Sequence, residues 1–142
     1  NCGRNGCWER YASATALISQ TKVAMEEYSD SKMWNCAGGK LENVSGRTAF
    51  DAMRMGDEIA KDVVDKYIYY VAVGVINIIN VYQPDVLCIG GGICNEGETL
   101  LAPIRKYCEE ERYSKYAKKQ TYICKAELGN DAGVIGAAML NG

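Results

Sequence analysis

Histidine is missing from this chain of 142 residues, and positive charge is not in excess, because 16 lysines and arginines stand against 18 aspartates and glutamates. A net charge of −2 argues against a surface that binds nucleic acid or an anionic membrane. Long apolar runs are also lacking: the longest, residues 71–79, contains Asn77 and is too short to cross a bilayer. No signal peptide is visible. These absences favour a cytoplasmic protein.

The cysteines are seven in number and scattered, and this odd count argues against a framework of disulfides and for a reducing compartment. Cys88 and Cys124 lie in apolar or β-prone runs, where we expect cysteine to act as a small buried hydrophobic residue. The length is that of one domain with a substantial core.

The first nine residues, Asn-Cys-Gly-Arg-Asn-Gly-Cys-Trp-Glu, place two thiols around a turn that contains two glycines. Gly3 and Gly6 allow the backbone to fold tightly, so Cys2 and Cys7 can converge on one tetrahedral Zn²⁺. Zinc needs four ligands, and the chain has no histidine and no further cysteine before Cys36. The opening therefore resembles half of a metal site, although two free cysteines or an adventitious disulfide remain the alternatives.

Hydrophobic periodicity predicts an α/β protein that is rich in helix. We predict helices over about 7–28, 48–54, 57–82, 98–111 and 132–140, a loop over 29–46, and strands over 86–89 and 121–127. The first strand is short and apolar, as is typical of a strand buried on both faces. The order strand, helix, strand, helix implies a parallel or mixed sheet covered by helices.

Three glycines, Gly90, Gly91 and Gly92, follow the first predicted strand, at the place where α/β sheets bind ligands. Because glycine has no Cβ, a phosphate or a ribose could approach the backbone N–H groups there. A dinucleotide fingerprint would need glycine where Asn95 stands, and the Gly-Lys-Ser/Thr ending of a P-loop is absent. A nucleotide site and a plain strand-to-helix turn both remain open on these residues alone.

Three segments carry a family pattern in the right order. Residues 2–9 and 11–15 read Cys-Gly-Arg-Asn-Gly-Cys-Trp-Glu and Tyr-Ala-Ser-Ala-Thr, residues 84–92 read Pro-Asp-Val-Leu-Cys-Ile-Gly-Gly-Gly, and residues 128–138 read Leu-Gly-Asn-Asp-Ala-Gly-Val-Ile-Gly-Ala-Ala. Together they resemble the C-terminal half of the ROK family (repressors, open reading frames and sugar kinases), and most of all its bacterial glucokinases. The resemblance covers essentially the whole chain. It implies an α/β actin/hexokinase-like (ribonuclease H-like) fold, of which this chain would be the C-terminal lobe, helix-rich with a small mixed sheet.

The family's zinc motif runs Cys-x-Cys-Gly-x-x-Gly-Cys-x-Glu, with a histidine ligand further upstream. Cys2 and Cys7 match its second and third cysteines, so the resemblance implies that the chain begins inside the motif. We expect a fragment of a parent roughly twice as long, with a structural zinc in the parent that the fragment does not retain. Glu9 matches the family glutamate that accepts hydrogen bonds from sugar hydroxyls; its alternative role is to complement the positive end of its helix.

The same resemblance implies that Gly90, Gly91 and Gly92, with Asn95, belong to the adenosine-binding segment. The implied activity is transfer of a phosphoryl group from Mg-ATP to the 6-hydroxyl of a hexose, most of all glucose, and the family precedent is a homodimer. The family's catalytic Asn-Asp pair, its Asp-x-Gly-Gly-Thr loop and its Glu-x-Gly-His motif are absent, so no catalytic residue is expected in this chain and the piece alone should be inactive. The general-base aspartate would lie in the missing half.

Two alternatives to glucose phosphorylation remain open. One is a kinase for another hexose, such as fructose, N-acetylmannosamine or N-acetylglucosamine. The other is a sugar-responsive transcriptional repressor, which would add nucleic acid as a partner through a DNA-binding segment ahead of this half.

Overall fold

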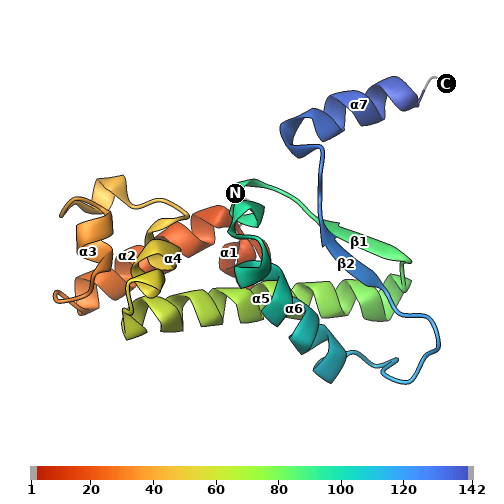
Figure 1. Ribbon diagram of the computed structural model, residues 1–142, viewed down its shortest axis with the longest axis horizontal. Helices are drawn as coiled ribbons and strands as arrows, with labels where there is room; N and C mark the ends of the chain where they lie inside the picture. Colours follow the sequence, from red (N-terminus) through yellow and green to blue (C-terminus); the bar gives the residue numbers. More distant parts are fainter. Residues whose placement is uncertain (1–2, 141–142) are drawn as a thin grey trace.

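The computed structural model describes residues 3–140. Its elements in chain order are α1 (Glu9–Ala12), α2 (Ala14–Glu27), α3 (Met33–Cys36), η1 (Leu41–Asn43), α4 (Thr48–Arg54), α5 (Glu58–Tyr82), β1 (Val86–Ile89), η2 (Gly92–Glu96), α6 (Glu98–Glu111), β2 (Tyr122–Lys125), η3 (Gly129–Asp131) and α7 (Ala132–Met139), where η marks a 3₁₀ helix. Figure 1 shows the long α5 running along the molecule, with α6 crossing it.

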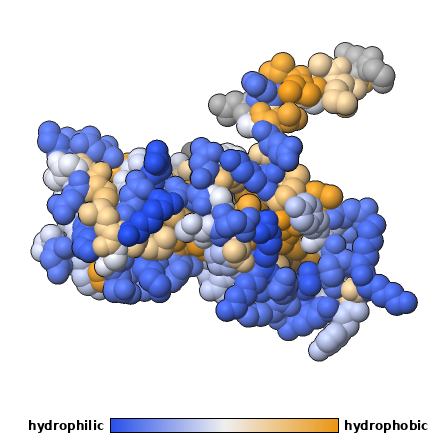
Figure 2. All heavy atoms as spheres, viewed as in Figure 1, coloured by the Kyte–Doolittle hydropathy of each residue, from blue (hydrophilic) through white to orange (hydrophobic). Residues whose placement is uncertain are grey.

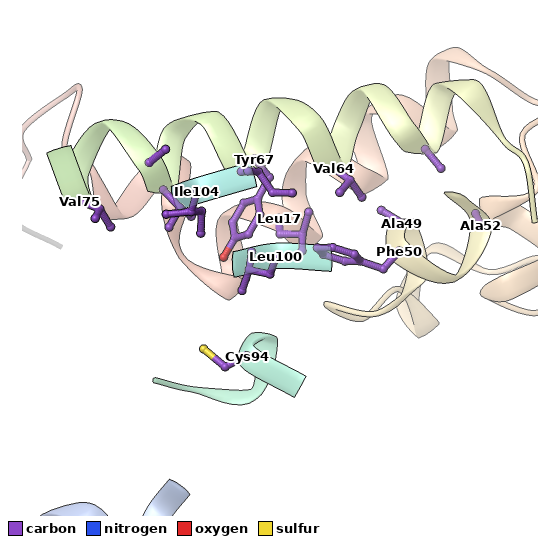
Figure 3. Packing of buried hydrophobic residues seen from close by; sticks show 14 of the residues in the cluster. Leu17, Ala49, Phe50, Ala52, Val64, Tyr67, Val75, Cys94, Leu100 and Ile104 are labelled. Atoms are coloured by element: carbon purple, nitrogen blue, oxygen red, sulfur yellow. The ribbon is translucent and has the colours of Figure 1, made fainter. Parts of the chain in front are cut away.

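Helix α5 organises the core. It begins where the Asp57 side chain accepts a hydrogen bond from the backbone N–H of Ala60, and it ends at Gln83, which has a φ of 43° ahead of Pro84. The predicted helix over 57–82 is thereby confirmed. Its buried face packs against α2, α4 and α6, and Figure 3 shows these layers meeting around residues of the core. The labelled members are Leu17, Ala49, Phe50, Ala52, Val64, Tyr67, Val75, Cys94, Leu100 and Ile104.

The N-terminal helical region is divided in two. The prediction of one helix over about 7–28 is wrong at Ser13, whose backbone is extended and whose hydroxyl accepts a hydrogen bond from the N–H of Ala16 as the cap of α2. A single non-helical residue leaves the hydrophobic period almost unchanged, and so the pattern does not reveal it. The predicted loop over 29–46 likewise contains two short helices, α3 and η1.

The two strands pair in parallel, with Val86 opposite Tyr122 and Ile89 opposite Lys125. In the described part of the chain the sheet has these two strands alone, so the expected mixed sheet is not found, whereas the parallel order is confirmed. Leu87 packs against the core, and β2 contacts α6.

The opposite face of the sheet is open. Val86 and Cys88 are exposed, so the prediction that the first strand is buried on both faces is wrong within residues 3–140. The expected burial of Cys88 is also wrong, and Cys124 is half-buried. Among the described thiols, Cys94 and Cys108 are the buried ones. The physical reason is that the described helices cover one face of the sheet and leave the other without a packing layer.

Helix α7 stands clear of the other helices (Figure 1), and none of its residues is buried. Its surface is strongly apolar, as Figure 2 shows, with Val134 73% and Met139 74% exposed. Within residues 3–140, no helix combines the length and the apolar character needed to cross a membrane.

Candidate functional site

The opening turn has the glycine geometry that its sequence suggests. Gly3 and Gly6 have φ values of +75° and +76°, which glycine adopts without the strain that a Cβ would cause. Cys7 follows as a half-buried free thiol, and Cys2 lies outside the described residues. Nowhere in residues 3–140 do three or more side chains of the ligand-forming types gather closely enough to hold a metal ion. The described residues therefore do not form a zinc site by themselves.

Trp8 anchors this turn to the core, a role that the sequence analysis missed. Its indole Nε1 donates a 2.7 Å hydrogen bond to the backbone oxygen of Tyr70 on α5. Its ring lies against Gly74, where a Cβ would stand 2.0 Å from Cε2 of the indole. The glycine inside α5, at one turn from Tyr70, was the signal that a large side chain packs there.

A second bond holds α1 to α5. The hydroxyl of Tyr67 donates to the backbone oxygen of Ala12 across 3.1 Å, and burial raises the pKa of Tyr67 to about 12, so the hydroxyl keeps the proton it donates. Trp8 and Tyr67 thus fix the two ends of the short α1 on the same long helix. A helix of one turn has little stability of its own and depends on such contacts.

Glu9, the first residue of α1, is exposed. Its carboxylate has no hydrogen bond or ion pair among the residues that the structure describes. An ionised carboxylate offers several acceptor sites and binds a ligand with clustered O–H groups well. The turn and the anchored α1 therefore present one free acceptor group to solvent.

The predicted glycine turn lies where β1 ends. Gly91 has a φ of +96°, a conformation that side-chain-bearing residues rarely adopt. A Cβ on Gly92 would meet no atom within 4 Å, and no positive φ requires glycine at that position. The space over Gly92 is thus open to a ligand that approaches the backbone.

Asn95 and Lys125 meet beside this turn. Lys125 is the last residue of β2, and its Nζ donates to Oδ1 of the exposed Asn95 across 3.2 Å. In parallel strands the carboxyl ends share one edge, so the lysine brings a positive charge to the glycine turn. Lys125 was not among the site residues predicted from the sequence; a basic residue near the end of the predicted strand 121–127 was the available signal.

Two ion pairs lie in the elements near the turn. Arg54, the last residue of α4, pairs with the buried carboxylate of Glu96 in η2, and its other nitrogen lies 2.8 Å from Asp51. Arg105 of α6 pairs with Glu98 at 2.6 Å and donates from Nε to the backbone oxygen of Ile123 in β2. The Arg54–Glu96 pair therefore ties η2, which follows the glycine turn, to α4, and Arg105 ties α6 to β2.

The structure brings Gly90, Gly91 and Gly92 together with Asn95 at one edge of the sheet, as the sequence analysis expects of a single segment. Glu9 lies on a separate element, and no hydrogen bond or ion pair within residues 3–140 joins it to the glycine turn. Both groups are exposed to solvent.

A protein-family model described as the ROK family matches residues 1–141. The chain belongs to the ROK family. A glucokinase of Halalkalibacterium halodurans is 34% identical over 140 residues, which are 99% of this chain and 42% of that protein. A glucokinase of Thermotoga maritima is 34% identical over 141 residues, 99% of this chain and 44% of that protein.

A solved structure gives the same result for the fold. The crystal structure of a ROK glucokinase from Streptomyces griseus, in complex with glucose and AMPPNP, matches with a TM-score of 0.81 and 30% identity, over 98% of this chain and 45% of that one. The expected actin/hexokinase-like fold of ROK sugar kinases is confirmed. The ROK chain spans less than half the length of the glucokinases that it matches.

Proposed function

We propose that this ROK chain is the C-terminal lobe of a longer sugar kinase that transfers the γ-phosphoryl group of ATP to the 6-hydroxyl of glucose. The observation that carries the proposal is the similarity, over nearly the whole chain, to a glucokinase whose structure contains glucose and AMPPNP. The similarity to two further glucokinases supports glucose as the sugar.

In this proposal Glu9 binds the sugar, and the glycine turn with Asn95 binds the nucleotide. Glu9 accepts hydrogen bonds from sugar hydroxyls, because its carboxylate is exposed and has no competing partner among the described residues. Gly90, Gly91 and Gly92, with Asn95, receive the nucleotide at the carboxyl edge of the sheet. The Nζ of Lys125 adds a positive charge for the phosphates.

The opening cysteines have a structural role in this proposal. Cys2 and Cys7 supply two of the four ligands of a zinc ion in the longer protein, and the remaining ligands come from outside this chain. The general base that removes the proton from the sugar hydroxyl also lies outside these 142 residues. The chain alone is therefore inactive.

A coupled assay of ADP release tests the proposal. The longer protein is given Mg-ATP with glucose, fructose, N-acetylmannosamine or N-acetylglucosamine, and the 142-residue chain serves as a parallel control. Turnover with glucose and none from the control are expected. Turnover that is faster with another hexose would show that glucose is not the preferred substrate. If no sugar is turned over and the protein binds DNA in a sugar-dependent manner, the protein is a repressor and not a kinase.

The role of Glu9 is tested in the same assay. A hydrogen bond to a charged group contributes about 1.5–3 kcal/mol, so Glu9→Gln should lower kcat/KM for glucose roughly 10- to 100-fold. Glu27→Gln, at an exposed carboxylate near the end of α2, is the matched control and should change kcat/KM less than about twofold. Equal effects of the two variants would contradict the assignment.

A further inference from the structure

Two cysteines lie directly opposite each other on the two strands of the sheet. The register pairs Cys88 of β1 with Cys124 of β2, and their sulfur atoms are 3.4 Å apart. Both side chains project from the face that the described helices leave open, since the neighbouring Leu87 and Ile123 pack into the core. Figure 1 shows the two strands, β1 and β2, side by side.

The pair is distinct from the other described thiols. Cys94 and Cys108 are buried, and the Cys94 thiol donates to the backbone oxygen of Ile89. Cys36 lies 3.7 Å from the sulfur of Met55. Cys88, by contrast, is exposed, and its nearest sulfur belongs to Cys124. Only this pair, within residues 3–140, combines two adjacent thiols with access to solvent.

We infer that Cys88 and Cys124 form a site at which a hydroperoxide oxidises two thiols to a reversible disulfide. The thiolate of Cys88 attacks the O–O bond of the hydroperoxide, which gives a sulfenic acid on Cys88 and releases an alcohol, or water when the oxidant is hydrogen peroxide. The Cys124 sulfur, on losing its proton, then attacks the Cys88 sulfur and expels the hydroxide, which takes up that proton as water. In total, two thiols lose two electrons and two protons, and the peroxide is reduced.

The backbone already has the separation that a disulfide needs. Neighbouring strands lie about 4.7–4.9 Å apart, and disulfides join Cα atoms about 4.4–6.8 Å apart. Directly opposed residues therefore satisfy the requirement without a movement of either strand. Rotation of the two side chains closes the remaining distance between the sulfur atoms.

The order of the two steps follows from exposure and from the hydrogen bond between the thiols. Cys88 is more exposed than Cys124 and is more accessible to a peroxide. The hydrogen bond with Cys88, together with burial, raises the pKa of Cys124, so Cys124 retains its proton and acts second. A thiol such as dithiothreitol or glutathione reverses the reaction by exchange.

A peptide map of the unaltered 142-residue chain tests the inference. The chain is treated with one equivalent of hydrogen peroxide, its remaining thiols are alkylated, and it is digested with trypsin without reduction. The expected product joins residues 67–105 to residues 120–125 and disappears after dithiothreitol. Because residues 67–105 also contain Cys94, the variant Cys94→Ser must retain the link and Cys88→Ser must lose it.

A parallel sample oxidised in urea shows whether the fold directs the pairing. In the unfolded chain the nearest thiol to Cys88 is Cys94, six residues away, so pairing within residues 67–105 should predominate. The link from Cys88 to Cys124 should be at least tenfold more abundant in buffer than in urea. Equal abundance, or free and alkylated Cys88 and Cys124 after oxidation in buffer, would overturn the inference.

Discussion

The contact with Trp8 explains why glycine stands at position 74 inside α5. Glycine inside a helix lowers stability by about 0.5–1 kcal/mol relative to alanine, yet the indole lies where a Cβ would be. The close contact also directs Nε1 to the backbone oxygen of Tyr70. Glycine at this position therefore allows the opening turn to pack against α5.

Gly74→Ala should lower the free energy of unfolding by about 1 kcal/mol or more, because overpacking costs about 1–3 kcal/mol and exceeds the gain in helix propensity. In a Trp8→Ala background the same change should raise the free energy of unfolding by up to about 1 kcal/mol. Urea denaturation of the four proteins in this cycle measures both values. A Gly74→Ala effect of the same sign and size in both backgrounds would show that the indole does not occupy the site.

Asp57 is a buried carboxylate with three donors around it. It accepts from the Ser31 hydroxyl at 2.6 Å, from the N–H of Lys32, and from the N–H of Ala60 at the start of α5. Burial alone would raise the pKa of Asp57, but the hydrogen bonds outweigh it and hold the pKa below its ordinary value. The ionised form is therefore bound more favourably in the folded chain than in the unfolded one.

Asp57→Asn should lower the free energy of unfolding at pH 7 by about 1–3 kcal/mol, because an amide cannot accept from all three donors. Since the folded pKa is depressed, the contribution of Asp57 is present above the unfolded pKa of about 3.9 and is lost as the pH falls further. Urea titrations at pH 7 and pH 3 check this. The control variant is Asp51→Asn, at an exposed carboxylate paired with Arg54, and it should change the free energy of unfolding by less than about 1 kcal/mol. A difference for Asp57→Asn that does not shrink at low pH would contradict the assignment.

At the scale of elements, the glycine turn depends on its neighbours. The short η2 has one residue, Cys94, in the core, and the Arg54–Glu96 pair ties its end to α4. Elements with few buried contacts open locally before the whole molecule unfolds. The ion pair should therefore govern how often η2 opens.

Arg54→Gln should leave Glu96 without its ionic partner and favour opening of η2 by about 1 kcal/mol, or roughly fivefold faster amide exchange. Hydrogen exchange read by mass spectrometry over residues 92–96 measures this. Lys61→Gln removes an exposed ion pair within α5 and is the matched control, expected to leave exchange in η2 unchanged. The same exchange rate in both variants would show that the pair does not brace the turn.

At the scale of the whole molecule, stability is concentrated in the packing of α2, α4, α5 and α6. Helix α7 makes its main contacts with the adjoining η3 and buries none of its residues. The fold of the remaining chain therefore does not depend on it.

Removal of residues 132–142 should change the free energy of unfolding by less than about 0.5 kcal/mol, as for surface changes elsewhere. Ile104→Ala, at a fully buried position of α6, should cost about 2–5 kcal/mol in the same urea titration and shows the sensitivity of the measurement. A loss of several kcal/mol on truncation would mean that α7 packs on the core in solution.

Much of the architecture follows from local patterns. The predicted helices 48–54 and 98–111 match α4 and α6, and the predicted strand 86–89 matches β1. The residues of each of these segments show a helical hydrophobic period or form an apolar run, so the segment can be predicted from its own sequence. The break at Ser13 was not predicted, because a single non-helical residue leaves the hydrophobic period almost unchanged. The exposure of Cys88 was not predicted either, because it depends on which helices cover the sheet.

The sequence by itself determined the α/β order of elements, the glycine turns and the membership of the ROK family, because these depend on local periodicity and on short motifs. Only the tertiary structure decided which distant residues meet. Trp8 reaches Tyr70 across 62 positions, Cys88 reaches Cys124 across 36, and Asn95 reaches Lys125 across 30. Strand register and helix packing select these partners, and both emerge from the whole chain rather than from any one segment.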